Sequence, residues 1–149
     1  MKKLFTTFVL IVVLQLILNV EKNEAQWMQC DGIYGGSVFS VAISGNNIFA
    51  GTSNNGVYLS TNNGTNWTQT SLNNYSVTSF AENGNNIFAG TSNGVYHTTN
   101  NGTSWTQTAL NNQDVRSLAI SGSNIFAGTN GSGVFLSTDN GTSWTQTAL

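Results

Sequence analysis

One octapeptide occurs three times along this chain and constrains its fold more than any other feature. Its most complete copy, in residues 137–144, reads Ser-Thr-Asp-Asn-Gly-Thr-Ser-Trp, and near-copies occupy residues 60–67 and 98–105. The tryptophans that end the three copies lie 38 and 39 residues apart. A second segment, Ile-Phe-Ala-Gly, recurs in residues 48–51, 87–90 and 125–128, which are 39 and 38 residues apart. The chain is therefore built of internal repeats with a period of about forty residues.

Each repeat contains four short segments that favour β-strands, separated by turns rich in Gly, Asn and Ser. In the first repeat they span residues 38–43, 47–52, 56–60 and 66–70, and the equivalent sets begin at Val77 and Val115. Apolar residues lie on both faces of these segments, as expected of sheets covered on both sides. The pattern predicts an all-β fold with three complete β-propeller blades of four antiparallel strands. Because closed propellers have about four to eight blades, we expect a partial or open propeller.

The first 25 residues have the composition of a secretory signal peptide. Lys2 and Lys3 precede an apolar run over residues 4–18, an order typical of such signals. The run is shorter than the roughly twenty residues that a membrane-spanning helix needs. We expect cleavage after Ala25, no stable membrane span afterwards, and a secreted or cell-surface protein, extracellular or periplasmic, from a bacterium. An uncleaved N-terminal anchor is the alternative.

The mature chain is expected to begin with part of a blade. Trp27, Met28 and Gln29 match the Trp-Thr-Gln segments later in the chain, so residues 26–36 are interpreted as an orphan outer strand and linker. Three repeats then follow, in residues 37–74, 75–112 and 113–149. Two explanations of the incomplete ring stay open. The chain is a fragment of a longer propeller, which we favour, or copies associate, for example two chains giving six blades.

Few ionisable side chains remain once residues 1–25 are removed. The carboxylates are Asp31, Glu82, Asp114 and Asp139, and the only arginine or lysine is Arg116. A nucleic-acid surface needs clustered Lys and Arg, so nucleic-acid binding is excluded.

Catalytic and metal-binding groups are similarly scarce. A glycosidase needs two facing carboxylates, but Glu82 and Asp114 stand at unrelated points of their repeats. His97 replaces a leucine found in the other two repeats and is interpreted as a strand residue, and Cys30 is a lone thiol without metal-ligand neighbours. We expect no cofactor, no metal site and no enzymatic activity.

The repeated octapeptide resembles the Asp-box, or bacterial neuraminidase repeat, found in sialidases, sortilin-like receptors and photosystem-assembly propellers. The resemblance implies a structural turn between the third and fourth strands of each blade. In it Asp139 would bond the turn backbone, Gly141 would supply a positive φ, and Trp144 would pack on its own and the neighbouring sheet. Two copies carry Asn in place of Asp, which keeps an oxygen acceptor. The structural positions implied are Ser60, Asn62, Gly64, Trp67, Thr98, Asn100, Gly102, Trp105, Ser137, Asp139, Gly141 and Trp144.

The resemblance is specific for fold and not for function. Sialidases of this family use an arginine cluster together with Tyr, Glu and Asp, and Arg116 is the only arginine here. We therefore expect a non-catalytic module for protein or glycan binding or scaffolding. Tyr58, Tyr75, Tyr96 and Trp27 are the aromatic candidates for stacking on sugars, although packing is the role that we favour for them. The alternative is an inactive portion of a sialidase-like glycoside hydrolase. Expected partners are the missing blades or a second copy, and a protein or glycan ligand.

Overall fold

A computed structural model describes residue 33 and residues 36–148. The strands in this part of the chain form three four-stranded antiparallel sheets, each with its strands in sequence order. Blade 1 contains β1 (Val38–Ser44), β2 (Asn47–Thr52), β3 (Val57–Ser60) and β4 (Thr68–Gln69). Blade 2 contains β5 (Val77–Asn83), β6 (Asn86–Thr91), β7 (Gly94–Thr98) and β8 (Thr106–Asn111). Blade 3 contains β9 (Val115–Ser121), β10 (Asn124–Thr129), β11 (Gly133–Ser137) and β12 (Thr145–Gln146).

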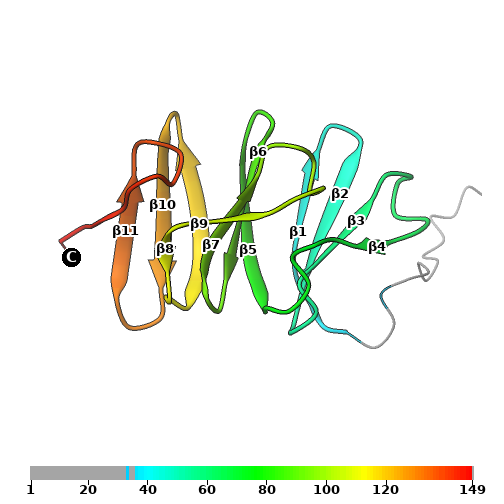
Figure 1. Cartoon of the computed structure of the whole chain (residues 1–149), viewed down its shortest axis with the longest axis horizontal. Coiled ribbons are helices and arrows are strands. Elements are labelled where there is room, and N and C mark those ends of the chain that lie inside the picture. Colours follow the sequence, from blue (N-terminus) through cyan, green and yellow to red (C-terminus); the bar gives the residue numbers. More distant parts are fainter. Residues whose placement is uncertain (1–32, 34–35, 149) are drawn as a thin grey trace, which may run out of the picture.

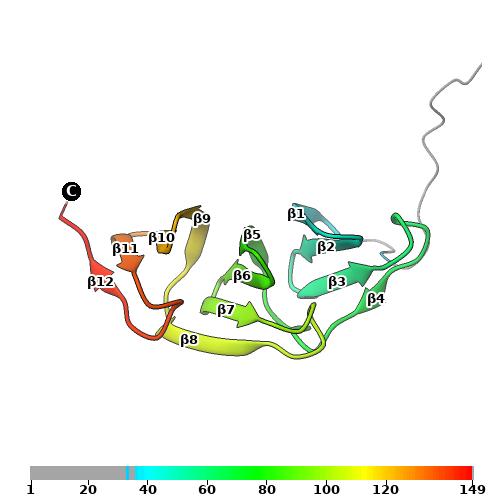
Figure 2. The ribbon, with the colours of Figure 1, turned by 90° about the horizontal axis from the view of Figure 1, so that it is seen from above.

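The three sheets confirm the predicted all-β fold of propeller blades, and they stand side by side in an open arc (Figures 1 and 2). The predicted signal peptide, residues 1–25, lies outside the described residues, as do Trp27, Cys30 and Asp31 of the predicted orphan strand and linker.

The first strands of the three blades lie next to one another along one side of the arc, and β4, β8 and β12 lie along the other (Figure 2). Neighbouring first strands run in the same direction. The Thr78 hydroxyl donates to the Val115 carbonyl at 2.6 Å, and the Asn83 amide, five residues further along β5, donates to the Gly122 carbonyl at 3.2 Å. These two contacts join residues that are 37 and 39 positions apart in the sequence, which is about one repeat.

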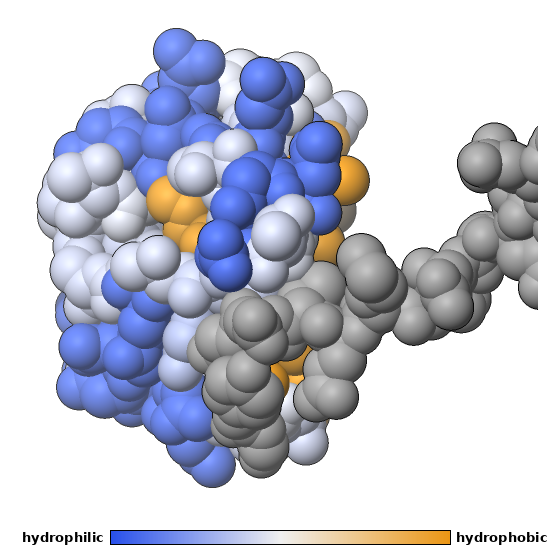
Figure 3. All heavy atoms as spheres, turned by 90° about the vertical axis from the view of Figure 1, so that its right-hand side faces the viewer, coloured by the Kyte–Doolittle hydropathy of each residue, from blue (hydrophilic) through white to orange (hydrophobic). Residues whose placement is uncertain are grey.

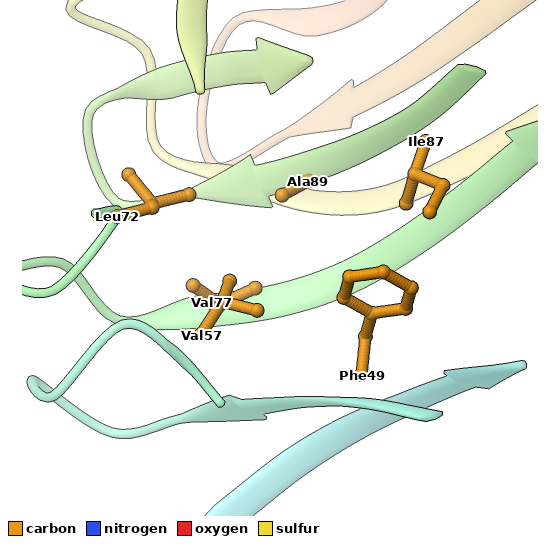
Figure 4. Packing of buried hydrophobic residues seen from close by; sticks show 6 residues of the cluster. All are labelled: Phe49, Val57, Leu72, Val77, Ile87 and Ala89. Atoms are coloured by element: carbon orange, nitrogen blue, oxygen red, sulfur yellow. The ribbon is translucent and has the colours of Figure 1, made fainter. Parts of the chain in front are cut away.

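The hydrophobic core consists of two clusters, one at each boundary between blades. Between blades 1 and 2, Phe49 and Val57 face Ile87 and Ala89 (Figure 4). The equivalent cluster between blades 2 and 3 is formed by Phe88, Val95, Leu110, Val115, Ile125 and Ala127. Because the apolar side chains at these two boundaries are buried only by contact between neighbouring blades, the stability of one blade depends on the next.

A glycine in the second strand of blade 1 and of blade 2 lets the following blade approach closely. A Cβ added to Gly51 would lie 2.7 Å from Cγ1 of Val77, and one added to Gly90 would lie 2.8 Å from Cγ1 of Val115. Real Cβ atoms do not come this close to another carbon, so a larger residue would push the two sheets apart. The contact between each of these glycines and the valine of the next blade therefore sets the distance between the two sheets.

Candidate functional site

The three octapeptides form turns with the same hydrogen bonds. In blade 3, the Ser137 hydroxyl accepts from the Gly141 N–H at 2.8 Å and donates to Asp139 Oδ1 at 2.8 Å. The same Oδ1 atom accepts from the Ser143 N–H at 2.9 Å. Equivalent bonds join Ser60, Asn62, Gly64 and Asn66 in blade 1 and Thr98, Asn100, Gly102 and Ser104 in blade 2.

The turn also fixes two residues in the left-handed region of backbone space. Asn140 has a φ of 55° and Gly141 a φ of 85°. Asparagine and glycine tolerate this conformation better than other residues do. In the other two turns the corresponding φ values are 55° at Asn63, 81° at Gly64, 54° at Asn101 and 79° at Gly102.

Asp139 differs from its two asparagine equivalents in carrying a charge. Its second oxygen, Oδ2, accepts from the Ser143 hydroxyl at 2.6 Å. The Ser143 side chain lowers the pKa of the Asp139 carboxyl below its usual value, and the Ser143 N–H and the Ser137 hydroxyl lower the pKa further. In blade 2 the corresponding hydrogen bond joins two uncharged groups, because the Asn100 amide donates to the Ser104 hydroxyl at 2.9 Å.

The tryptophan of each of the second and third turns packs on the preceding blade. Trp105 meets Phe49 edge to face, with ring centroids 6.4 Å apart, and Trp144 packs against the cluster that contains Phe88. The glycines lie beside the same residues, since a Cβ on Gly102 would be 2.9 Å from Phe49 Cε1. These turns hold adjacent blades together, and they bring no set of reactive groups into one place.

Exposed amide side chains gather along one edge of the arc. We call this the asparagine edge and define it as the turns after the second strands (53–55, 92–93, 130–132) and the connections between blades (73–76, 111–114). Backbone bonds join these segments, from the Ser92 N–H to the Ser76 carbonyl at 3.1 Å and from the Asn130 N–H to the Asp114 carbonyl at 2.8 Å. Its exposed amides include Asn54, Asn55, Asn73, Asn74, Asn111 and Asn112.

The structure brings two of the aromatic candidates together. Tyr75, in the connection after blade 1, and Tyr96, on β7, have ring centroids 5.4 Å apart. Burial raises the pKa of the Tyr96 hydroxyl and the Tyr75 side chain raises that pKa further, whereas Asn93 lowers it. Tyr58 belongs to β3, where it pairs with Gln69, and lies apart from this pair. Trp27 is outside the described residues.

Glu82 and Asp114 are not brought into a facing pair. Asp114 precedes Val115, which lies beside Thr78, whereas Glu82 stands four residues further along β5. At about 3.3 Å per residue this separates them by about 13 Å, more than the roughly 5–9.5 Å of glycosidase carboxylates. Asp114 instead forms an ion pair with Arg116, whose Nη2 lies 2.6 Å from Asp114 Oδ2.

His97 and the other potential metal ligands of the described range form no metal-binding cluster. His97 stacks on Phe88 with centroids 5.8 Å apart, so it takes the packing position of the leucine in the other blades. Within the described range, no three His, Cys, Asp or Glu side chains gather in a way that could hold a metal ion. That range also contains no helix with the length and hydropathy of a membrane span.

The geometry defines an open segment of a β-propeller. Residues 34–149 match the model of the DUF6242 beta propeller domain, and the chain therefore belongs to this family. No curated protein matched the chain.

Several solved structures are similar to the chain. An ancestral GH74 enzyme is 28% identical, with a TM-score of 0.64 over 74% of this chain and 18% of that one. The GH74 enzyme of Niastella koreensis is 29% identical, with a TM-score of 0.60 over 82% of this chain and 20% of the enzyme. YCF48 bound to D1 peptide is 19% identical, with a TM-score of 0.63 over 79% of this chain and 41% of YCF48. This chain thus spans less than half of each.

Proposed function

We propose that the chain is a secreted, non-catalytic β-propeller module that binds a protein or glycan along the asparagine edge and supplies three blades of a larger propeller. The observation that carries the proposal is the composition of that edge, whose segments contain the exposed amides together with Tyr75, which pairs with Tyr96, and Asp114, which pairs with Arg116. Amide groups both donate and accept hydrogen bonds, and tyrosine adds an apolar ring with a polar tip. This combination suits sugar hydroxyls and extended peptide backbones.

The three octapeptide turns have a structural role in this proposal. We infer that they are Asp-box turns, on the basis of their shared hydrogen bonds and the tryptophans packed between blades. The similarity to YCF48, whose structure was solved with a peptide, supports binding as the activity of such a propeller.

Two paired variants test the binding edge. The full chain would be screened against glycan and peptide arrays, and the strongest binder measured by calorimetry. Asn73→Ala with Asn74→Ala removes two exposed amides from the asparagine edge, and we expect at least a tenfold loss of affinity. The matched control, Asn46→Ala with Asn85→Ala, removes two exposed amides from turns at the opposite edge. Equal affinities in the two variants would place binding elsewhere and refute the proposed edge.

An enzymatic alternative rests on the two GH74 structures, which are 28% and 29% identical to this chain. In that case the chain is an inactive portion of a glycoside hydrolase of the sialidase type. This alternative expects no hydrolysis of any array oligosaccharide by the purified chain and hydrolysis by the longer protein that contains it; a longer protein that binds an oligosaccharide without hydrolysing it would contradict the alternative.

Secretion has its own test. When the complete coding sequence is expressed in a bacterium, we expect the chain outside the cytoplasm, with an N-terminus at Gln26 by mass spectrometry. Retention in the cytoplasm with Met1 in place would contradict it.

A further inference from the structure

The two ends of the arc carry different faces. At one end, the first strand of blade 1 exposes Val38, Val41 and Ile43, which are 45%, 60% and 62% exposed. Hydrophobic atoms are visible at this end of the molecule (Figure 3). We call these three residues the leading face. At the other end, Phe126, Gly128 and Val134 of blade 3 form the trailing face.

Both faces have buried counterparts inside the arc. Val77 and Val115, which stand where blade 1 has Val38, are completely buried. Likewise Phe49 and Phe88 are completely buried at the position that Phe126 takes in blade 3, where the ring is partly exposed. The leading and trailing faces are therefore the two halves of an interface that the chain forms twice within itself.

The matching contacts are specific. Inside the arc, Val77 packs on Gly51 and Val115 packs on Gly90. In the leading and trailing faces, Val38 and Gly128 stand at these positions, and a Cβ on Gly128 would meet only Ser117 within 4 Å. The space that a following valine takes up at the other two glycines is thus open beside Gly128.

A polar contact is matched in the same way. The Leu118 N–H of blade 3 donates to the Ser79 hydroxyl of blade 2 at 2.9 Å. Val41 is the equivalent of Leu118 on the leading face, and Ser117 is the equivalent of Ser79 in blade 3. The N–H donor and its hydroxyl acceptor are therefore both present for one more interface of the same kind.

We propose that the leading face of one copy of this chain docks on the trailing face of a second copy. The inference rests on the proposed propeller module and names what covers its ends. Head-to-tail contacts close into a ring when the rotation between subunits permits. One copy has three blades, so two copies have six. Six lies within the usual range of about four to eight blades, whereas the blades of three copies would exceed that range. The assembly is therefore a closed dimer with two identical interfaces.

A pair of variants with equal charge and nearly equal exposure provides the test. Val41→Glu places a carboxylate where blades 2 and 3 have Phe80 and Leu118, which pack on the preceding blade. Phe39→Glu, outside the leading face and 53% exposed, places one where blades 2 and 3 have the polar Thr78 and Arg116. By light scattering of the full chain across a hundredfold range of concentration, we expect a dimer for the unmodified chain and for Phe39→Glu. We expect a monomer for Val41→Glu, with an unchanged circular dichroism spectrum.

A mixing experiment establishes the direction of docking. Val134→Glu damages the trailing face and should also give a monomer. Mixing Val41→Glu with Val134→Glu restores one intact interface, so we expect a weaker heterodimer at high concentration. If the two faces instead paired each with its own kind, mixing would restore nothing.

The inference is overturned by a folded monomer of the unmodified chain at every concentration, by a dimer that survives Val41→Glu, or by an unlimited series of larger species. The first of these would mean that further blades of a longer protein cover the ends, and the binding edge would still stand. Loss of array binding with the dimer intact would refute the proposed function and leave this interface in place.

Discussion

Replacing Phe49 by alanine tests how strongly the boundary between blades holds the arc together. The Phe49 side chain is completely buried, and its ring centroid lies 6.4 Å from those of Phe80 and Trp105 in blade 2. A buried aromatic side chain removes about 150–250 Å² from water, which corresponds to about 4–6 kcal/mol at about 25 cal/mol per Å². Alanine keeps part of that burial, so we expect the free energy of unfolding to fall by about 3–5 kcal/mol.

Phe39 is a matched control in the same blade. It is 53% exposed, and polar residues, Thr78 and Arg116, take its place in the other blades. Phe39→Ala should therefore lower the free energy of unfolding by less than about 1 kcal/mol. The two variants lose the same atoms, so the difference between them isolates the contribution of burial.

Urea unfolding, followed by circular dichroism and by tryptophan fluorescence, gives the comparison. Where Phe49→Ala does not fold, Phe49→Leu keeps most of the volume and should cost about 1 kcal/mol. Equal losses for Phe49→Ala and Phe39→Ala would refute the assignment of the core to the blade boundary. A reduced urea dependence for Phe49→Ala would show that blade 1 unfolds separately.

Two further predictions concern the turns. Gly102→Ala adds a Cβ 2.9 Å from Phe49 Cε1 at a φ of 79°, so it should cost about 2–5 kcal/mol in urea unfolding, from strain and overpacking together. Gly84→Ala, with a φ of 61° and no atom within 4 Å, should cost only the strain, about 1–2 kcal/mol; equal costs would contradict the contact with blade 1. Asp139 has a lowered pKa, so its carboxylate stabilises the fold above the unfolded value near 3.8, and this contribution disappears as the pH falls through the folded pKa. Urea unfolding between pH 7 and 2 should therefore show that Asp139→Asn loses less stability below about pH 4 than the unmodified chain does. The control Glu82→Gln removes a charge outside the turns, so it keeps the Asp139 contribution and should still lose that contribution below about pH 4.

Much of the blade architecture could be predicted from the repeats. The predicted strand at residues 47–52 coincides with β2, and the one at 38–43 ends one residue before β1 does. The fourth strands were less predictable. Although the segments after Trp67 and Trp105 are nearly identical, β4 has two residues and β8 has six. The turn before β7 is one residue shorter than that before β3, so Gly94 pairs with Asn111 and extends β8.

The candidate site was harder to predict. The alternation of apolar residues shows that both faces of a strand are covered, but it does not show that Trp105 meets Phe49 across a blade boundary. Nor does the sequence pattern show that Tyr75 meets Tyr96 while Tyr58 stays apart. These contacts depend on the curvature of the arc, which is set by tight packing at Gly51 and Gly90 and has no local signature.

The second strands of the three blades have a further consequence for folding. β2, β6 and β10 share the sequence Asn-Ile-Phe-Ala-Gly-Thr without a single difference. The side chains of a second strand therefore do not distinguish its own blade from another, and pairing in the wrong blade is the misfolding route to expect in such a repeat chain. The first strands do differ, since β1, β5 and β9 read Val-Phe-Ser-Val-Ala-Ile-Ser, Val-Thr-Ser-Phe-Ala-Glu-Asn and Val-Arg-Ser-Leu-Ala-Ile-Ser. What keeps each second strand in its own blade is the short turn that joins it to its first strand, residues 45–46, 84–85 and 122–123, so lengthening one of these turns is the change expected to favour pairing between the wrong blades.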